Sequence, residues 1–401
     1  MAMIPLLLAA ALIPQSSLAT YPLQPHGGPE VRVHRQATPL VALRLSTPVP
    51  VTLPEGAVEL LQELARPDAE AEARRFGARV SLRHDLGRAV MTVTGPATAF
   101  DAMAAILRRA AGTPDLSVAD LRRARARAEG RVLARLEQPA PRVRRYLHYG
   151  LHGGPEPRGA GGTRLGPEAI RRVGAELYRP GRVRVVLVGD VPDVVIRSAF
   201  GDWPTAREGN RAEPRFDTAA AAARPQADRE WGGIAFPVEG DPAVLAVAAA
   251  LVQQRVERSA LRYGSVEAWY EPAPALVLVG AATPGDSVVE ASAGISDLAV
   301  RDASAVPLTD VRRYLRRLIA EAAALAGTDV VTRARTAVRR RLLLEARTAA
   351  GKAEVIGRVA DHCGPAVRAD DYLERLEGVQ LADVRALLRR LLETAAVVDE
   401  S

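Results

Sequence analysis

Cysteine and lysine are almost absent from this 401-residue sequence. Cys363 is the one cysteine, which excludes an intramolecular disulfide and any metal site built from several thiolates. Lys352 is the one lysine, so nearly all of the positive charge is arginine. The sequence also lacks G-x-S-x-G, G-x-x-x-x-G-K-[ST] and G-x-G-x-x-G patterns, which leaves no serine-hydrolase, P-loop or dinucleotide-binding signature.

Aromatic residues are scarce as well, at 4% of the chain. The cores must therefore be packed by Ala, Val and Leu, within a hydrophobic content of 48%. Together with 25% charged residues, this composition is typical of a soluble globular protein. The length suits two domains of about 180–200 residues each. Beyond the N-terminus, no segment is apolar over enough residues to span a bilayer, so we predict no transmembrane segment.

The net charge of +7 raises the question of nucleic-acid binding. The arginines are interleaved with Glu and Asp, as in 121–135, and no aromatic platform lies among them. We therefore interpret them as solvated helix faces and predict no nucleic-acid partner. The locally dense runs Arg142–Arg145 and Arg339–Arg341 keep that alternative open.

The first 19 residues resemble a secretory signal peptide. A short apolar stretch, 4–13, is followed by the small residues Ser17-Leu18-Ala19, which fit a cleavage site near Ala19. A basic n-region is missing, and a disordered cytosolic start is the alternative. The pattern predicts a periplasmic or secreted protein.

Hydrophobic periodicity predicts an α+β fold that is used twice. Strands are expected at 31–34, 40–45, 79–83, 89–94 and 183–188, and helices at 57–65, 69–76, 99–111, 117–138 and 167–177. The second half repeats this order, and segments 116–137 and 164–189 parallel segments 328–347 and 375–400. We predict two similar α/β-sandwich domains, 30–206 and 229–401, which face each other and are joined by a linker at 207–228.

Several local motifs follow one another along the chain. They are Gly56, Gly77–Ser81, His152–Pro155 with Gly162-Thr163, Tyr178–Pro180, Val186–Asp190 and Ser265–Tyr270. Their order resembles that of the insulinase-type (M16) zinc peptidases. The resemblance covers nearly the whole chain after the signal and implies a clam-shell of two homologous domains. In that family a glycine precedes a helix with H-x-x-E-H, two zinc ligands and a general base. A glutamate on a later long helix is the third ligand.

The resemblance breaks down at the zinc motif. With Gly56 in register, the motif positions fall on Glu59, Gln62 and Glu63, so the sequence has E-x-x-Q-E. The third-ligand position falls on Ala134 or Arg135, and an arginine there would oppose a metal cation. The resemblance therefore implies an inactive pseudopeptidase without catalytic residues and without zinc.

The sequence contains two other candidate metal sites. Glu59 and Glu63 could share Ca²⁺ or Mg²⁺, but two solvated acids on an exposed turn near Arg66 is the interpretation we favour. His148 and His152 have i,i+4 spacing, but Gly150 and the glycines after His152 argue for a loop. His34 and His84 lie in expected strands without a partner pattern. We therefore predict no metal ligand.

The family resemblance also suggests partners. Its members work as paired halves or subunits that close around a peptide, and one half supplies an Arg and a Tyr to the substrate carbonyl. The nearest counterparts are Arg255 and Tyr263, with Arg258 or Arg262 as alternatives to Arg255. The leading hypothesis is a non-catalytic subunit that pairs with an active M16 peptidase, or with a second M16-like chain, and helps to bind peptide. The alternative is a structural or scaffolding protein of an envelope assembly.

Overall fold

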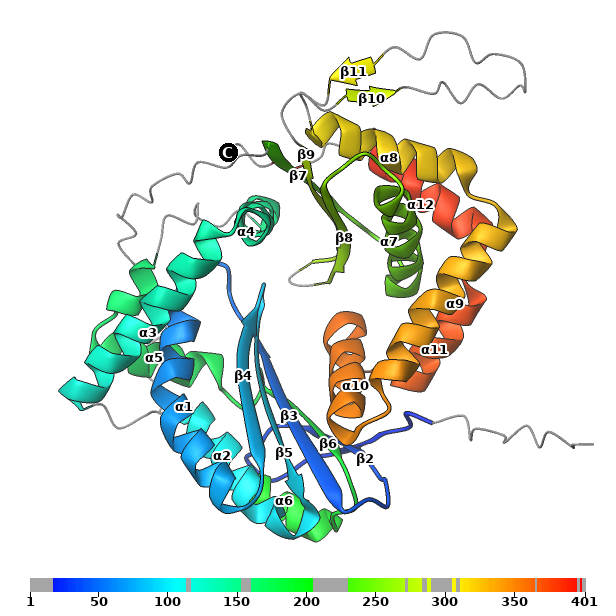
Figure 1. The fold of residues 1–401 in the computed structure, drawn as a ribbon. Coiled ribbons are helices and arrows are strands. Elements are labelled where there is room, and N and C mark those ends of the chain that lie inside the picture. The colour runs from blue at the N-terminus through cyan, green and yellow to red at the C-terminus, as the bar shows by residue number, and fades with distance from the viewer. Residues whose placement is uncertain are drawn as a thin grey trace, which may run out of the picture.

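The computed structural model describes residues 17–112, 117–152, 160–204, 230–270, 273–282, 287–289, 305–307, 311–364, 366–394 and 397–398. These residues form two sheet-and-helix halves around a central region (Figure 1). The predicted linker 207–228 lies outside them. Among the described helices none is both long and apolar enough to cross a membrane.

The N-terminal half is built on a six-stranded sheet. Its strand order is β1 (Tyr21–Leu23), β2 (Val31–His34), β6 (Arg184–Val188), β3 (Leu40–Pro48), β5 (Arg88–Pro96) and β4 (Arg79–Asp85). Among the described strand pairs of this sheet, β2–β6 alone is parallel. The described helices that pack within this half are α1 (Ala57–Arg75), α2 (Phe100–Ala111), α3 (Val118–Glu137), α5 (Pro167–Leu177) and α6 (Asp193–Gly201). The short 3₁₀ turns are η1 (Ala97–Ala99) and η2 (Gly161–Arg164).

The C-terminal half repeats this plan with a four-stranded antiparallel sheet. Its order is β12 (Val397–Val398), β7 (Glu230–Pro237), β9 (Ala275–Ala282) and β8 (Tyr263–Trp269). Its helices are α7 (Pro242–Glu257), α8 (Val311–Leu325), α9 (Thr328–Glu345), α11 (Ala369–Gly378) and α12 (Leu381–Glu393). A separate pair, β10 (Ser287–Val289) and β11 (Ala305–Pro307), lies beside α8 in Figure 1. The predicted duplicated α+β fold is confirmed.

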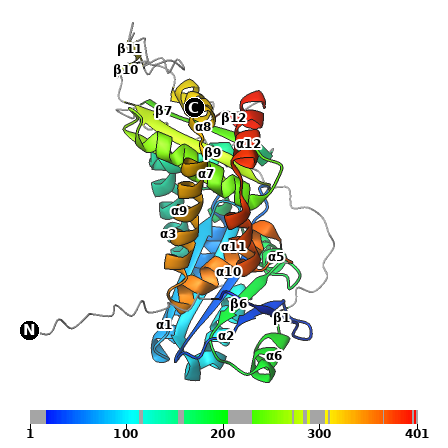
Figure 2. The same cartoon turned by 90° about the vertical axis from the view of Figure 1, so that its right-hand side faces the viewer.

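Each half gives one helix to the sheet of the other. Helix α10 (Ala349–Cys363), from the C-terminal half, packs on β3 and β6 of the N-terminal sheet. Helix α4 (Pro139–His152), from the N-terminal half, packs on β7 and β9 of the C-terminal sheet. Figure 2 shows the same crossing from the side, with α10 against the strands of the N-terminal half. The two halves are therefore joined by reciprocal packing as well as by the chain.

Strand β3 is buried on both faces of its sheet, and its alternate side chains differ in polarity. Val41, Leu43 and Leu45 point to the core beneath α1 and α2, because alternate side chains of a strand share a face. Arg44 and Ser46 point the other way, toward α10, and both are buried. A strand that is buried on both faces is ordinarily apolar throughout, so a buried Arg44 requires charged partners on α10.

Two helix predictions need correction. The expected pair 57–65 and 69–76 is one helix, α1, which continues through Pro67. Proline cannot donate to the carbonyl four residues earlier, but the Glu63 carbonyl accepts from Arg127 Nη2 at 3.2 Å instead. Helices α4 and α10 were not predicted as separate elements. Pro139 was expected only to end a helix, whereas it begins α4, where its missing N–H costs little.

Gly357 allows α10 to approach β3. A Cβ atom built at this position would lie 2.3 Å from Arg44 Nη1 and 2.7 Å from Arg44 Cζ. We expect Gly357→Ala to lower the free energy of unfolding by about 1–3 kcal/mol, because buried Arg44 has little room to move. Gly130→Ala is the matched control, since nothing lies within 4 Å of the added carbon on exposed α3. Chemical denaturation of both variants checks this, and equal effects would contradict it.

Candidate functional site

The three positions of the degenerate motif lie on one buried turn of α1. Gly56 precedes this helix with φ of +92°, and a Cβ there would lie 2.7 Å from Thr163 Cγ2, so the position requires glycine. Glu59, Gln62 and Glu63 are exposed by only 4%, 4% and 1%. The expectation of two solvated acids on an exposed turn was therefore wrong. Buried carboxylates need counter-charges, and the tertiary structure supplies them.

Glu63 is bound by three arginines. Arg66 Nε lies 2.9 Å and Arg131 Nε 3.1 Å from its Oε1, and Arg127 Nε lies 3.0 Å from its Oε2. Arg127 and Arg131 are four residues apart on α3, so they reach Glu63 from one face of that helix. Both carboxylate oxygens are thereby occupied by guanidinium groups.

Glu59 is bound from three different elements. Arg135 Nη1 on α3 and His84 Nδ1 on β4 both approach its Oε1, at 2.8 and 2.9 Å, and Arg145 Nη2 on α4 lies at 3.9 Å. Burial disfavours the charged carboxylate, but these neighbours outweigh it and hold the pKa of Glu59 well below its usual range. Of the two candidates for the third-ligand position, Arg135 is the one that reaches the motif. His84 was expected to lack a partner, and that was wrong.

Gln62 stands where the general base of the family motif would be. Its Nε2 donates to the Arg83 carbonyl at 2.7 Å and so ties α1 to β4. A neutral amide does not accept a proton from water at ordinary pH, so Gln62 is unsuited to general-base chemistry. The hydrogen bond that Gln62 makes holds α1 against β4.

A small cavity remains beside Glu59. Its volume is about 20 Å³, and its walls include Glu55, Glu59, His84, Arg145 and His148. Arg145 binds both oxygens of Glu55, with Nε 2.7 Å from Oε2, and the Tyr149 hydroxyl donates to the same oxygen at 3.1 Å. Such a volume holds about one water molecule. The space therefore has no room for a peptide.

The histidines of α4 form a second feature of this wall. His148 and His152 lie on the helix, not in the expected loop, with ring centroids 5.0 Å apart. His148 also meets the Trp269 ring at 5.8 Å, and neither Nε2 atom has a hydrogen-bond partner within the described part of the chain. Burial, with help from His152 and Arg145, lowers the pKa of His148 to about 3. His148 is therefore neutral at pH 7.

This shift predicts a pH dependence of stability. A histidine whose pKa falls from 6.5 in the unfolded chain to about 3 in the folded chain takes up protons on unfolding, so stability decreases as pH falls from 6.5. We expect His148→Gln to reduce this slope between about pH 6 and pH 5 by up to roughly 1.4 kcal/mol per pH unit. His26→Gln, at an exposed position, is the control. An unchanged slope in urea titrations of the His148 variant would contradict the assignment.

The structure does not bring Arg255 and Tyr263 together. Arg255 lies on α7, and its Nη2 is 3.3 Å from Glu321 Oε2 on α8. Tyr263 begins β8 and points to the opposite face of the sheet, where its hydroxyl accepts from Arg144 Nη2 at 2.8 Å. Arg144 also pairs with Glu267 at 2.6 Å. A joint role in substrate binding stays a prediction.

The donor set does not suit zinc. The two motif carboxylates are already bound by arginines and a histidine, and the third position is an amide that donates to backbone. A cationic Arg135 at the third-ligand position opposes a divalent cation. Across the described ranges, no group of three or more His, Cys, Asp or Glu side chains is arranged to hold a metal ion.

Comparison with known proteins identifies solved structures that share the fold of this chain. No family model and no curated protein matches the chain. Solved structures do match, among them a protease from Helicobacter pylori with a TM-score of 0.73, 11% identity and coverage of 95% of this chain and 99% of that one. A peptidase M16 inactive domain from Pseudomonas fluorescens matches with a TM-score of 0.67 and 13% identity, over 95% of this chain and 97% of that one. A chain of Complex III2 from Candida albicans matches with a TM-score of 0.68 and 12% identity, over 96% of this chain and 95% of that one.

These likenesses extend over nearly the whole of each chain. They confirm the resemblance at the level of the fold, which is that of the M16 peptidases. At 11–13% identity they show the fold alone, and activity must be argued from the site itself.

Proposed function

We propose that this chain, which has the M16 peptidase fold, is a non-catalytic member that pairs with an active zinc peptidase of the same fold and helps to bind its peptide substrate. One observation carries the first part of the proposal: arginines from α3 neutralise the motif carboxylates. Arg135 meets Glu59 at 2.8 Å, and Arg127 and Arg131 meet Glu63 at 3.0 and 3.1 Å. Because these arginines occupy and neutralise the motif carboxylates, the site offers neither ligands for a metal ion nor a general base.

The pairing rests on the architecture. Because α4 and α10 clasp the two halves of one chain, we infer that a chamber for peptide opens between chains rather than by separation of these halves. The P. fluorescens chain is described as a peptidase M16 inactive domain, which supports the existence of this fold without catalysis.

A scaffolding role is the second candidate. The similar chain from C. albicans is part of a Complex III2 structure, so the same fold is found in a large assembly. In that case we expect this chain to present its outer surface to unrelated envelope proteins.

Co-purification separates these two roles. A tagged chain is isolated from its native envelope, and its companions are identified by mass spectrometry. The proposal expects a protein of similar size with H-x-x-E-H in near-equal amount. Recovery of unrelated envelope proteins alone would replace pairing with scaffolding.

Catalysis is tested on the purified chain with added zinc. We expect no hydrolysis of a mixed peptide library above a buffer blank. Hydrolysis that a chelator abolishes and that persists after further purification would overturn the inactive assignment.

The proposed export predicts where the signal is cleaved. Leu18 is fully buried, its backbone N–H donates to Asp370 Oδ1 at 2.7 Å, and His34 Nδ1 lies 2.8 Å from the Ala19 carbonyl oxygen. Cleavage after Ala19 would remove Leu18 from the core, so the packing favours cleavage upstream of Ser17. We expect intact mass and N-terminal sequencing of exported protein to show that Leu18 is retained. A mature chain that begins at Thr20 would support the Ala19 site instead.

A further inference from the structure

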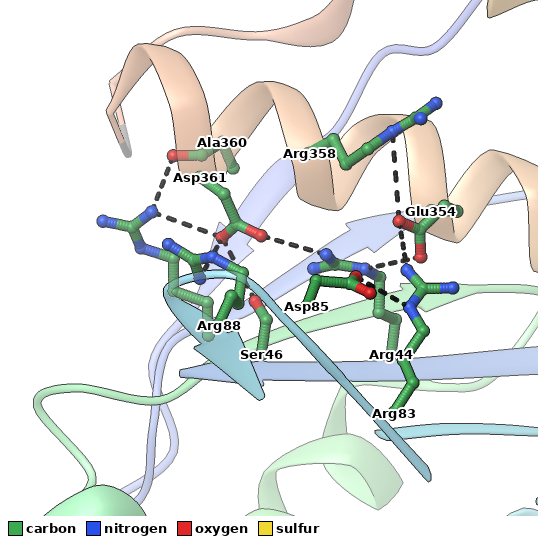
Figure 3. Close-up of polar contacts among 10 residues, drawn as sticks. Arg44, Ser46, Arg83, Asp85, Arg88, Glu354, Arg358, Ala360 and Asp361 are labelled. Carbon is green, nitrogen blue, oxygen red and sulfur yellow. Dashed lines mark hydrogen bonds and ion pairs between the residues drawn. The ribbon is translucent and has the colours of Figure 1, made fainter. Parts of the chain in front are cut away.

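A second cavity lies between the halves, where α10 crosses the N-terminal sheet. Its volume is about 140 Å³, and its walls include Arg44, Arg88, Arg358, Trp269, Tyr270 and His362. Figure 3 shows the polar side chains of the sheet and of α10 that converge here. The β4–β5 turn separates it from the cavity beside Glu59, since Gly87 lines that cavity and Leu86 lines this one.

The two buried carboxylates beside this cavity, Asp361 and Glu354, already have arginine partners. Asp361 is reached by Arg88 Nη1 at 2.8 Å, Arg44 Nη2 at 3.0 Å, the Ser46 hydroxyl at 3.1 Å and Arg184 Nη1 at 3.3 Å. Glu354 is bound by Arg44 Nε at 2.9 Å and by Arg83. Within the described part of the chain, no group of three or more His, Cys, Asp or Glu side chains is arranged to hold a metal ion here.

Guanidinium groups, by contrast, are in excess. Five arginines, which are Arg44, Arg83, Arg88, Arg184 and Arg358, face four acids, which are Asp85, Glu345, Glu354 and Asp361. Arg358 pairs with Glu345 through one nitrogen, Nη2. Together the arginines carry about 25 N–H donors against about 16 acceptor sites on the acids. Arg44 is 1% exposed, and its Nη1 has no acceptor among the described residues. Crowding by Arg44 and Arg184 adds to burial in lowering the pKa of Arg88 to about 10.

The other wall of the cavity is aromatic. Trp269 and Tyr270 come from the end of β8 in the C-terminal half, and the Tyr270 ring stacks on His362 at 4.2 Å. A ligand here would thus meet guanidinium groups on one side and apolar ring surface on the other. A volume of 140 Å³ corresponds to about four or five water molecules, enough for a carboxylate with a short carbon chain.

We propose that this cavity binds the carboxylate group of a small ligand or of a peptide C-terminus, with Arg358 and Arg44 as its charged contacts. A planar carboxylate matches the guanidinium fork and supplies the acceptors that this cluster lacks. The carbon atoms next to the carboxylate pack on Trp269 and Tyr270. Because the site joins residues of both halves, its ligand also strengthens their contact.

Titration calorimetry on the full purified chain tests this proposal without any partner protein, so its result is independent of the pairing proposed above. The probes are acetate, inorganic phosphate, an N-acetylated alanyl-leucine with a free carboxylate, and the same dipeptide as its C-terminal amide. We expect the acid to bind at least about tenfold more tightly than the amide and to weaken with added salt. If acetate and phosphate bind as tightly as the dipeptide acid, the ligands are small free anions. If the dipeptide acid binds more tightly than acetate and phosphate, the ligand is a peptide C-terminus.

Arg358→Met keeps the side-chain length and removes the charge, and we expect it to weaken binding of the dipeptide acid at least about tenfold. Arg340→Met, at an exposed position of α9, is the matched control. Circular dichroism verifies that both variants fold. Equal binding of acid and amide by the unaltered chain, or equal affinities in the two variants, would overturn the proposal.

Discussion

Asp361→Asn is expected to lower the free energy of unfolding by about 3–5 kcal/mol, the largest single effect of any substitution between the halves. The substitution keeps the size of the side chain, so the loss comes from its charge. Arg44, Arg88 and Arg184 all contact this carboxylate, and Arg44 is 1% exposed. Without Asp361 these cations face one another in a buried space. Urea denaturation monitored by circular dichroism at pH 7 measures the change.

Asp202→Asn, at the exposed C-terminal end of α6, is the control and is expected to change stability by less than about 0.5 kcal/mol. The pH dependence provides a second measurement. Despite burial, the arginines hold the pKa of Asp361 below its usual range, so its contribution is present above the unfolded pKa and is lost as pH falls. Asp361→Asn should therefore reduce the loss of stability on acidification. If the free energy of unfolding changes by less than about 1 kcal/mol at pH 7, water solvates the arginines that lose the carboxylate, and the prediction is wrong.

Restoring the metal motif should not restore zinc binding. In the triple variant Glu59→His, Gln62→Glu and Glu63→His, the sequence again has H-x-x-E-H, but Arg135 still lies at the third-ligand position. Repulsion between Zn²⁺ and a guanidinium group at roughly 4 Å amounts to several kcal/mol. We expect far less than one zinc per chain after dialysis, as measured by competition with a chromophoric chelator.

Adding Arg135→Glu to the triple variant replaces the repelling cation with an anionic ligand. We expect this fourth substitution to raise zinc affinity by at least about 100-fold. Arg340→Glu in the triple background makes the same charge change at an exposed site of α9 and should leave affinity nearly unchanged. Tight zinc binding by the triple variant alone would show that Arg135 does not oppose the metal.

Local sequence patterns predicted much of the fold. Strand alternation located β3, β4 and β5, and the repeated segments indicated a duplicated α+β architecture. Helix α4 was not predicted because Pro139 indicated the end of a helix and Gly150 indicated a loop. For α4 and α10 alike, periodicity does not indicate which sheet covers a helix. Both pack on the sheet of the other half.

The sequence by itself determined that the motif positions are Glu59, Gln62 and Glu63, which excludes an imidazole pair there. Only the tertiary structure decided that these acids are buried and which cations bind them. Arg127 is 64 residues from Glu63 in the chain, and His84 is 25 residues from Glu59. Arginines of one helix look alike in sequence, whether solvated or paired. Their partners are set by packing, because burial makes an unpaired charge costly and so selects the arginines within reach.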